Sequence, residues 1–473
     1  MQIGWCASRK DAEDPLLVAA KGQYCAIDAL SFNRSLEPLA GRPSLSPGFA
    51  DRKLNFRSAK VRLASMLLPR TLSGLLEKAV KGFPAALVTG PRQSGKTTLL
   101  RSHFDATHRY VSLEAPHVRE RALADPVGFL GDHPPPVILD EIQHAPALLS
   151  YLQVAIDEDR RPGRWLLSGS QSFPLLQGTS ESLAGRVAIL TLLPLSWSEI
   201  QHRARAEDSI EIVLRELLEA RPAAAAPAQP DLAQWLLRGG FPQLWSDPDV
   251  DRQLWLASYV QTYLERDVRS VLGVRDLGAF QTFLRLAAAR TGQVLNLVDL
   301  ARDAGVSPPT ARQWLSVLEA SHQIFFLRPH FENLGKRLIK APKLYWLDTG
   351  MVCFLLGLKD EEAVLRGPMA GALFETAMVT ELAKCFYHRG LPPALWYWRS
   401  RDGWEVDLLI ELQEKLHPVE IKATATPRPA HAESLVRWQS LAGDKAGSGL
   451  LLTQAEEASS LVPGVRVIPW NRL

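Results

Sequence analysis

A short glycine-bounded loop carries the clearest chemical signal in this chain. It runs Gly90-Pro91-Arg92-Gln93-Ser94-Gly95-Lys96-Thr97-Thr98, after the apolar stretch 85–89 and before helix-prone residues. Glycines at both ends let the backbone wrap closely around an anion, with successive N–H groups and the helix start facing it. Lys96 can reach the β- and γ-phosphates of a nucleoside triphosphate, and the Thr97 hydroxyl can bind Mg²⁺. The spacing predicts a nucleotide site.

An acidic pair follows at the end of a second apolar stretch, 136–139. Asp140 would lie at the mouth of a sheet, where it can hold Mg²⁺ through water. Glu141 would then polarise the attacking water as general base. The alternative is a buried strand that ends in a solvated acidic turn. The alternation of strand and helix patterns after the glycine loop favours the catalytic interpretation.

Two further segments offer candidates for the same site. The stretch 165–171 reads as a strand ending in Ser170 and Gln171, either of which could contact the γ-phosphate or order the water; a plain polar turn is the alternative. Arg186 could neutralise transition-state charge in trans, from a neighbouring copy in a homo-oligomer. An ordinary surface arginine is the competing interpretation.

A second constellation lies near the C-terminus. Asp407 and Glu420 fall on strand-like stretches thirteen positions apart, and Lys422 shares a strand face with Glu420. The three carboxylates of Glu375, Asp407 and Glu420 could bind a divalent cation, with Lys422 stabilising developing charge. The pattern is similar to that of PD-(D/E)XK nucleases, with Val406-Asp407 in place of Pro-Asp. Two alternatives stay open: a cross-strand salt bridge, and a nuclease-like fold that binds without cleaving.

The elements that must position these groups alternate along the chain. Apolar strand candidates separated by helical patterns predict a parallel α/β sheet with helices on both faces; they cover 85–89, 109–113, 136–139, 165–168 and 187–192. Residues 231–290 read as helical. The C-terminal stretch from 366 reads as a small mixed α/β domain, with a helix at 373–387 before its strands.

Residues 291–365 predict a winged helix-turn-helix. Two short helical patterns flank a tight turn at Gly305, with Ser307 as the cap of the second helix, and strands are expected at 324–327 and 344–347. Such a unit could meet DNA phosphates through a basic set or serve as a protein-protein module. The set comprises Arg312, Lys336, Arg337, Lys340 and Lys343.

The order of these motifs resembles that of bacterial AAA-type ATPases with a C-terminal domain of unknown function related to restriction endonucleases. The matching stretches are 87–100, 137–146, 167–171, 181–194, 239–242, 259–268 and 346–350. The resemblance covers nearly everything from Met66 onward and implies an AAA-like fold and ATP, with Mg²⁺, rather than GTP. It implies an AAA-like core over 66–200 and a nuclease-like domain over 366–473.

Composition limits the remaining possibilities. The chain has 473 residues, 46% hydrophobic and 22% charged, and a net charge of +3, too small to indicate nucleic-acid binding by itself. No apolar run suits a membrane span, no secretory pattern opens the chain, and the scattered cysteines suggest a reducing cytoplasm. Residues 1–65 read as a disordered extension, with Met66 as the expected start, and 201–230 as a linker or insertion. The four cysteines are Cys6, Cys25, Cys353 and Cys385.

These patterns predict a cytoplasmic ATPase whose hydrolysis drives a DNA-associated or nuclease-like C-terminal domain. The alternative is a nucleotide-controlled switch that binds a protein partner through a catalytically inactive C-terminal domain. DNA, a protein partner and a second copy of the chain are the partners that these patterns leave open.

Overall fold

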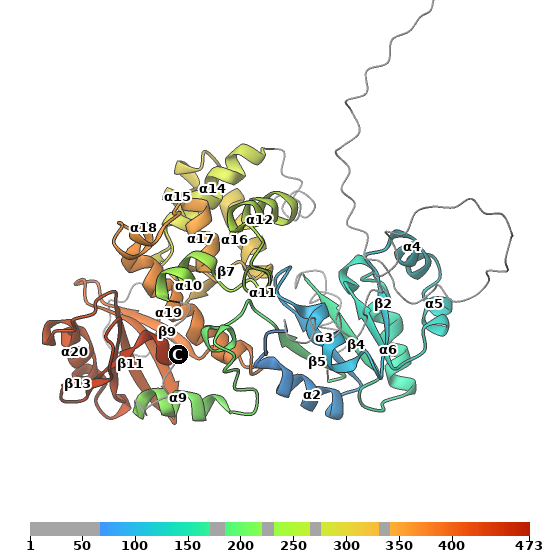
Figure 1. Ribbon diagram of the computed structural model, residues 1–473, viewed down its shortest axis with the longest axis horizontal. Helices are drawn as coiled ribbons and strands as arrows, with labels where there is room; N and C mark the ends of the chain where they lie inside the picture. The colour runs from blue at the N-terminus through green and yellow to red at the C-terminus, as the bar shows by residue number, and fades with distance from the viewer. Residues whose placement is uncertain (1–66, 171–184, 220–230, 265–275, 331–340) are drawn as a thin grey trace, which may run out of the picture. The chain divides into compact units, whose positions relative to one another are not determined.

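The computed structural model describes residues 67–170, 185–219, 231–264, 276–330 and 341–473 (Figure 1). Its first part is a sheet of five parallel strands in the order β2-β3-β4-β1-β5. The strands are β1 Ala85–Thr89, β2 Arg109–Ser112, β3 Val137–Asp140, β4 Trp165–Gly169 and β5 Val187–Thr191. The helices are α2 Leu72–Gly82, α3 Lys96–Phe104, α4 Pro116–Ala124, α5 Pro126–Asp132, η1 Ile142–His144 and α6 Leu148–Glu158.

Both faces of this sheet are covered, as predicted. Strand residues of one parity, such as Leu87 and Leu139, pack against α4, α5 and α6. Residues of the other parity, such as Val88 and Ile138, pack against α2 and α3. A parallel strand covered on both sides must be apolar along its whole length, which explains the unbroken apolar runs in the sequence.

The middle part is mainly helical, with a small antiparallel sheet in the order β6-β8-β7. Helix α15, a turn with Gly305 at φ +68°, and helix α16 form the expected helix-turn-helix, and the Ser307 hydroxyl accepts the Thr310 N–H to cap α16. The elements are α8 Trp197–Ile200, α9 Ile210–Glu219, α10 Leu232–Arg238, α11 Gln243–Ser246, α12 Arg252–Tyr259, η2 Val260–Leu264, α14 Leu277–Ala289, β6 Gln293–Val294, α15 Leu297–Asp303, α16 Pro308–Ala320, β7 Ile324–Leu327, β8 Lys343–Trp346, α17 Thr349–Leu356 and α18 Glu361–Leu365.

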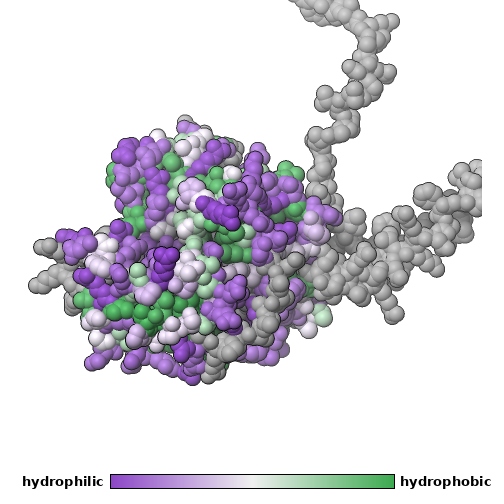
Figure 2. All heavy atoms as spheres, turned by 60° about the vertical axis from the view of Figure 1, so that its left-hand side comes forward, coloured by the Kyte–Doolittle hydropathy of each residue, from purple (hydrophilic) through white to green (hydrophobic). Residues whose placement is uncertain are grey.

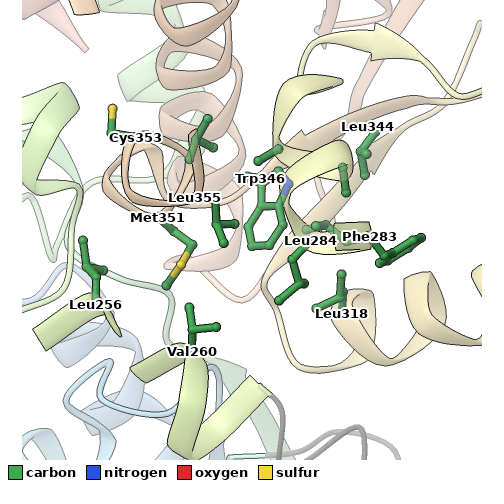
Figure 3. Close-up of a cluster of buried hydrophobic side chains, with 14 of the residues drawn as sticks. Leu256, Val260, Phe283, Leu284, Leu318, Leu344, Trp346, Met351, Cys353 and Leu355 are labelled. Carbon is green, nitrogen blue, oxygen red and sulfur yellow. The ribbon is translucent and has the colours of Figure 1, made fainter. Parts of the chain in front are cut away.

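The core of this middle part gathers around Trp346 of β8 and Met351 of α17, which lie among Val260, Leu284 and Leu318 (Figure 3). Trp314 of α16 is buried there, edge-on to Phe280 and Phe283 at ring-centroid distances of 5.2 and 5.1 Å. Because Trp314 points into this core, it is not available to read DNA bases.

The C-terminal part is a six-stranded mixed sheet in the order β13-β14-β12-β11-β10-β9. Helix α19 covers one face and helix α20 the other. The elements are α19 Ala370–Tyr387, β9 Leu395–Arg399, β10 Glu405–Leu412, β11 Lys415–Lys422, η3 Pro429–Ala432, α20 Glu433–Ala442, η4 Gly443–Lys445, β12 Gly449–Thr453, β13 Ser459–Val462, β14 Val465–Pro469 and η5 Trp470–Arg472. Strand β13, with exposed or half-buried residues, was not predicted because it lacks a buried apolar face.

One segment differs from the prediction, and the N-terminal segment lies outside the residues that the structure describes. Helix α9 falls within 201–230, which we predicted as a linker or insertion; its Ile210, Leu214 and Leu217 are buried in the same core as α19. Residues 1–66 lie outside the described ranges. No helix within the described ranges is long and apolar enough to span a membrane. Hydrophilic and hydrophobic side chains are interspersed on the face in Figure 2.

Candidate nucleotide and carboxylate sites

The glycine loop connects β1 to the start of α3, as its spacing predicts. Gly90 has φ +140°, and a Cβ placed there would lie 2.1 Å from the Leu192 carbonyl oxygen. Gly95 has φ +94° and directly precedes α3. Only glycine suits these two positions, because side chains are disfavoured at positive φ and Gly90 has no space for one. The loop that begins at Gly90 therefore leads directly into the N-terminal turn of α3, which contains Lys96, Thr97 and Thr98. The N–H groups of this turn would face the phosphates.

Lys96 lies inside this loop. Its Nζ donates to the carbonyl oxygens of Gly90 at 3.1 Å and Pro91 at 2.8 Å, and the residue is 4% exposed. Burial lowers the pKa of Lys96 to about 8, against the opposing effect of the Glu141 and Asp140 charges. A cation held this way is positioned to meet a phosphate with little further desolvation.

Asp140 is the centre of a hydroxyl cluster. Its carboxylate accepts from Thr97 Oγ1 at 2.9 and 3.1 Å, from Tyr110 Oη at 2.7 Å, and from Ser168 Oγ. Tyr110 and Ser168 come from β2 and β4, the two neighbours of β3 in the sheet. Sequence reasoning missed both, because nothing in the chain order says which strands flank Asp140. Thr97 and Asp140 present oxygen atoms of the kind that Mg²⁺ prefers, so the two residues would fit an ATP-bound Mg²⁺.

Glu141 follows Asp140 in the left-handed conformation, with φ +57°. Its N–H donates to Ser168 Oγ at 3.2 Å. Its carboxylate Oε2 accepts from the Gln143 amide and from Ser170 Oγ, the latter at 3.3 Å, and Gln143 Nε2 also donates to Ser170 Oγ at 3.0 Å. Ser170, a sequence candidate, thus meets the predicted base directly. Gln143 was missed; its position two residues after the acid pair was the available signal.

The remaining candidates lie apart from this cluster or outside view. Arg186 makes a two-point ion pair with Asp157 at the end of α6, with both nitrogen-oxygen distances at 2.9 Å. This pair holds the pKa of Asp157 down at about 2. A role for Arg186 in trans stays a prediction. Gln171 falls within the segment 171–184, which the structure does not describe.

The helical part of the chain also reaches the phosphate loop. Tyr259 Oη donates to the Arg92 carbonyl oxygen at 3.4 Å, and Gln323 Nε2 donates to Tyr259 Oη at 3.0 Å. Burial, together with the Lys96 charge, lowers the pKa of neighbouring His322 to about 4. The loop is therefore contacted by residues far downstream in the chain.

A line of buried charged side chains connects the loop to the C-terminal end of α19; we call it the ionic line. Arg70 donates to the Ser94 carbonyl oxygen at 2.7 Å, and its Nε lies 3.2 Å from Glu199 Oε2. Glu199 accepts the Thr71 N–H at 2.6 Å, and its Oε1 lies 3.4 Å from Nδ1 of His388, at the end of α19. Burial alone would raise the pKa of Glu199, but the neighbouring Arg70 and His388 hold it below its ordinary value.

Comparisons with known proteins agree with this division. Residues 82–201 match an AAA domain, 229–362 a domain of unknown function (DUF8612), and 370–473 another (DUF4143). The chain is 33% identical over 387 residues to the uncharacterized proteins Rv2008c of Mycobacterium tuberculosis and Mb2031c of Mycobacterium bovis, covering 81% of this chain and 80% of each relative. It belongs to their family.

The first part of the chain is thus an AAA-type P-loop ATPase domain, and both C-terminal domains are of unknown function. Two solved structures share 16% identity with the chain. The Walker-type ATPase PABY2304 of Pyrococcus abyssi has a TM-score of 0.37, covering 61% of this chain and 96% of its own. A single-residue variant of RuvB from Thermotoga maritima has a TM-score of 0.25, covering 57% and 89%.

The DUF4143 domain brings the four predicted C-terminal residues together around a central pair of strands. Lys422 Nζ lies 2.5 Å from Glu420 Oε1 and 3.9 Å from Asp407 Oδ2. The Ile421 N–H donates to Asp407 at 2.9 Å, and Ser434 Oγ donates to Glu420 at 2.9 Å. Burial, with the Asp407 charge, raises the pKa of Glu420 to about 7 despite Lys422.

A lysine of the middle part lies in the middle of these carboxylates. Lys343 Nζ, from β8, lies 2.9 Å from Glu375 Oε1, 2.5 Å from Glu405 Oε1 and 3.7 Å from Asp407 Oδ1, and its side chain is 3% exposed. Tyr345 Oη also donates to Glu375 Oε1, at 2.6 Å. Lys343 was missed as a member of this site.

This lysine changes the interpretation of the C-terminal site. Its ammonium already pairs with Glu375 and Asp407, two of the three carboxylates that would have to bind a cation. Within the described ranges, no three His, Cys, Asp or Glu side chains are grouped to hold a metal ion. The residues therefore do not fit the divalent site that we predicted at Glu375, Asp407 and Glu420. The geometry instead resembles the alternative, a salt-bridged cluster.

The basic set predicted for DNA is also divided. Lys343 is buried among carboxylates, so it cannot contact a phosphate backbone. Arg312 is exposed on α16. Lys336, Arg337 and Lys340 lie in the segment 331–340, outside the described residues.

Proposed function

We propose that this protein is a Mg²⁺-dependent ATP hydrolase that acts as a nucleotide-controlled switch. The observation that carries the hydrolytic part is the pair of side-chain clusters behind the phosphate loop. One joins Thr97 to Asp140, and the other holds the Glu141 carboxylate through Gln143 and Ser170. Mg²⁺ bound with ATP would neutralise phosphate charge at Thr97 and Asp140.

The residues of this chain take separate roles in the proposal. Lys96 exchanges its two loop carbonyl partners for phosphate oxygens, at small cost because it is already buried. The backbone N–H groups of the loop hold the phosphates in place. Glu141 accepts a proton from the attacking water. Ser170 contacts Glu141 directly, so a change at the γ-phosphate that moves Ser170 would also reposition the base.

The decisive experiment compares ATP binding and turnover in the full chain. In Glu141→Gln, we expect nucleotide affinity within a few-fold of wild type and kcat lower by at least ~100-fold, the usual size of a general-base contribution. Lys96→Ala should lose nucleotide binding. Glu158→Gln, an exposed acid on α6, is the matched control and should behave as wild type. Normal turnover in Glu141→Gln would overturn the assignment of the base.

For the C-terminal domain, two functions were open: a DNA-directed nuclease and a catalytically inactive domain that binds a protein partner. The position of Lys343 supports the second, because its ammonium pairs with Glu375 and Asp407, two of the three carboxylates that a metal ion would need. The ionic line from Ser94 through Arg70 and Glu199 to His388 supports coupling between this domain and the nucleotide. We place this switch in the cytoplasm.

A cleavage assay separates these two functions. Wild-type protein with ATP and Mg²⁺ or Mn²⁺ is incubated with single- and double-stranded DNA, beside Asp407→Ala and Lys422→Ala. We expect no metal-dependent cleavage in any of the three. Cleavage by the wild type that both variants abolish would establish the nuclease and refute the switch.

A further inference from the structure

A charged cavity of about 250 Å³ lies outside both sites described above. It is enclosed by the segment that follows β5, by α9, by the C-terminal end of α19 and by the last residues of the chain. Cationic side chains dominate its polar lining, and Glu216 is the single acidic side chain among the described residues that line it. The basic residues are Arg203, Arg205, Lys384, His388, Arg389 and Arg472.

Several of these cations are already engaged by protein groups. Arg205 forms ion pairs with Asp208 and with Glu216, the latter at 2.6 Å. Lys384 pairs with Glu381 at 2.8 Å. Arg389 donates to the carbonyl oxygens of Arg205 and Asp208, at 3.2 and 2.8 Å, but carbonyl dipoles do not neutralise its charge.

Arg203 is different. Its Nε is buried without a hydrogen-bond partner, and no carboxylate within the described ranges pairs with its guanidinium. Burial, and then the positive charge of Arg472, lower the pKa of Arg203. A guanidinium nevertheless stays protonated in proteins, so its charge must be offset from elsewhere. A half-buried, uncompensated arginine beside further cations is costly unless an anion joins it.

We propose that this cavity binds a small phosphate-bearing anion through Arg203. Arginine presents a planar fork of donors that matches the oxygens of a phosphate group in a bidentate way, and Arg389 and Arg472 add positive potential. The cavity volume suits an inorganic phosphate or diphosphate group. The apolar residues Leu214, Leu217 and Ile468 close its other side.

The cavity also adjoins the ionic line to the phosphate loop. His388 lines the cavity and lies 3.4 Å from Glu199, which pairs with Arg70, the donor to Ser94. An anion bound beside His388 would change the electrostatic environment of the contact between His388 and Glu199, and through Glu199 that of Arg70. The bound anion would thereby act as an effector of the nucleotide site. This second step rests on the proposed nucleotide binding, whereas anion binding itself does not.

The test measures inorganic pyrophosphate binding by calorimetry to the full-length protein saturated with ADP, so that the phosphate loop is occupied. We expect one further binding site. Arg203→Met should weaken it at least 10-fold, and Arg203→Lys, which keeps the charge but loses the fork, should weaken it less. The matched control is Arg215→Met, an exposed arginine of α9, which should bind as wild type does.

Two outcomes would overturn the proposal: no binding to ADP-saturated wild type, or equal affinity in Arg203→Met with its fold intact by circular dichroism. In a second measurement, pyrophosphate should change the ADP dissociation constant of wild type and leave that of Arg203→Met unchanged. Retained pyrophosphate binding without any effect on ADP would refute the effector role alone. Failure of ADP to bind at all would refute the proposed function instead.

Discussion

Replacing Glu199 by glutamine tests the buried ionic line most directly. The carboxylate is fully buried and accepts the N–H groups of Thr71 at 2.6 Å and Ser196 at 2.9 Å, in addition to its pairs with Arg70 and His388. Removing one partner of a buried ion pair costs about 3–5 kcal/mol, because the other charge stays buried. Glutamine keeps one acceptor oxygen for a backbone N–H. We therefore expect the lower end of this range, about 3 kcal/mol.

The stabilisation that Glu199 contributes should depend on pH. Arg70 and His388 hold the pKa of Glu199 below its ordinary value in the folded protein, although burial opposes them. A group with a depressed pKa stabilises the fold above its unfolded pKa, about 4.3, and loses that contribution as pH falls through the folded value. The difference in unfolding free energy between wild type and Glu199→Gln should therefore be constant from pH 7 to 5 and shrink below about 4.3.

Urea unfolding followed by tryptophan fluorescence at pH 7, 5 and 3.5 measures this difference. The matched control is Glu207→Gln, whose partner Lys78 lies 3.7 Å away with both side chains mostly exposed. Exposed pairs contribute about 0–1 kcal/mol, so this variant should stay within that range of wild type. A difference for Glu199→Gln that stays the same from pH 7 down to pH 3.5, or one as small as that of the control, would refute the reasoning.

Three further substitutions test other contacts. Gly90→Ala places a Cβ 2.1 Å from the Leu192 carbonyl oxygen at φ +140°, so we expect at least ~10-fold weaker ATP binding in a nucleotide titration. Tyr110→Phe removes one of three hydroxyl donors to Asp140 and should lower the unfolding free energy by about 1.5–3 kcal/mol, the cost of a hydrogen bond to a charged group, as measured in urea. Lys343→Met leaves a buried carboxylate cluster without its cation and should destabilise the fold by about 3–5 kcal/mol. Mn²⁺ should then raise the melting temperature of Lys343→Met more than that of the wild type. Equal increases in melting temperature for the two proteins would contradict our interpretation of Lys343.

Much of the nucleotide site could be predicted from the chain itself because its residues are close in sequence. The loop from Gly90 to Thr97 works through backbone geometry that two glycines and one helix start determine locally. The acid pair at Asp140 follows a strand whose apolar run is unmistakable. The start of α16 at Ser307 could likewise be predicted locally, because the Ser307 side chain caps the N–H group three residues ahead.

The partners of those residues depend on tertiary packing. Tyr110 and Ser168 reach Asp140 only because β2 and β4 flank β3, and strand order is not written in any local pattern. Lys343 could be mistaken for a surface cation, as charged residues usually are exposed. Packing of β8 against α19 buries it between Glu375 of α19 and Asp407 of β10.

The amino-acid sequence by itself therefore determined that this protein has a phosphate loop, an acid pair beside it and a second set of charged residues near its end. Only the tertiary structure decided what that second set can do. Carboxylates separated in sequence attract either a metal ion or a lysine, and the choice depends on which cation the fold brings within about 3–4 Å, where charges in a buried site interact strongly. Here the fold brings Lys343.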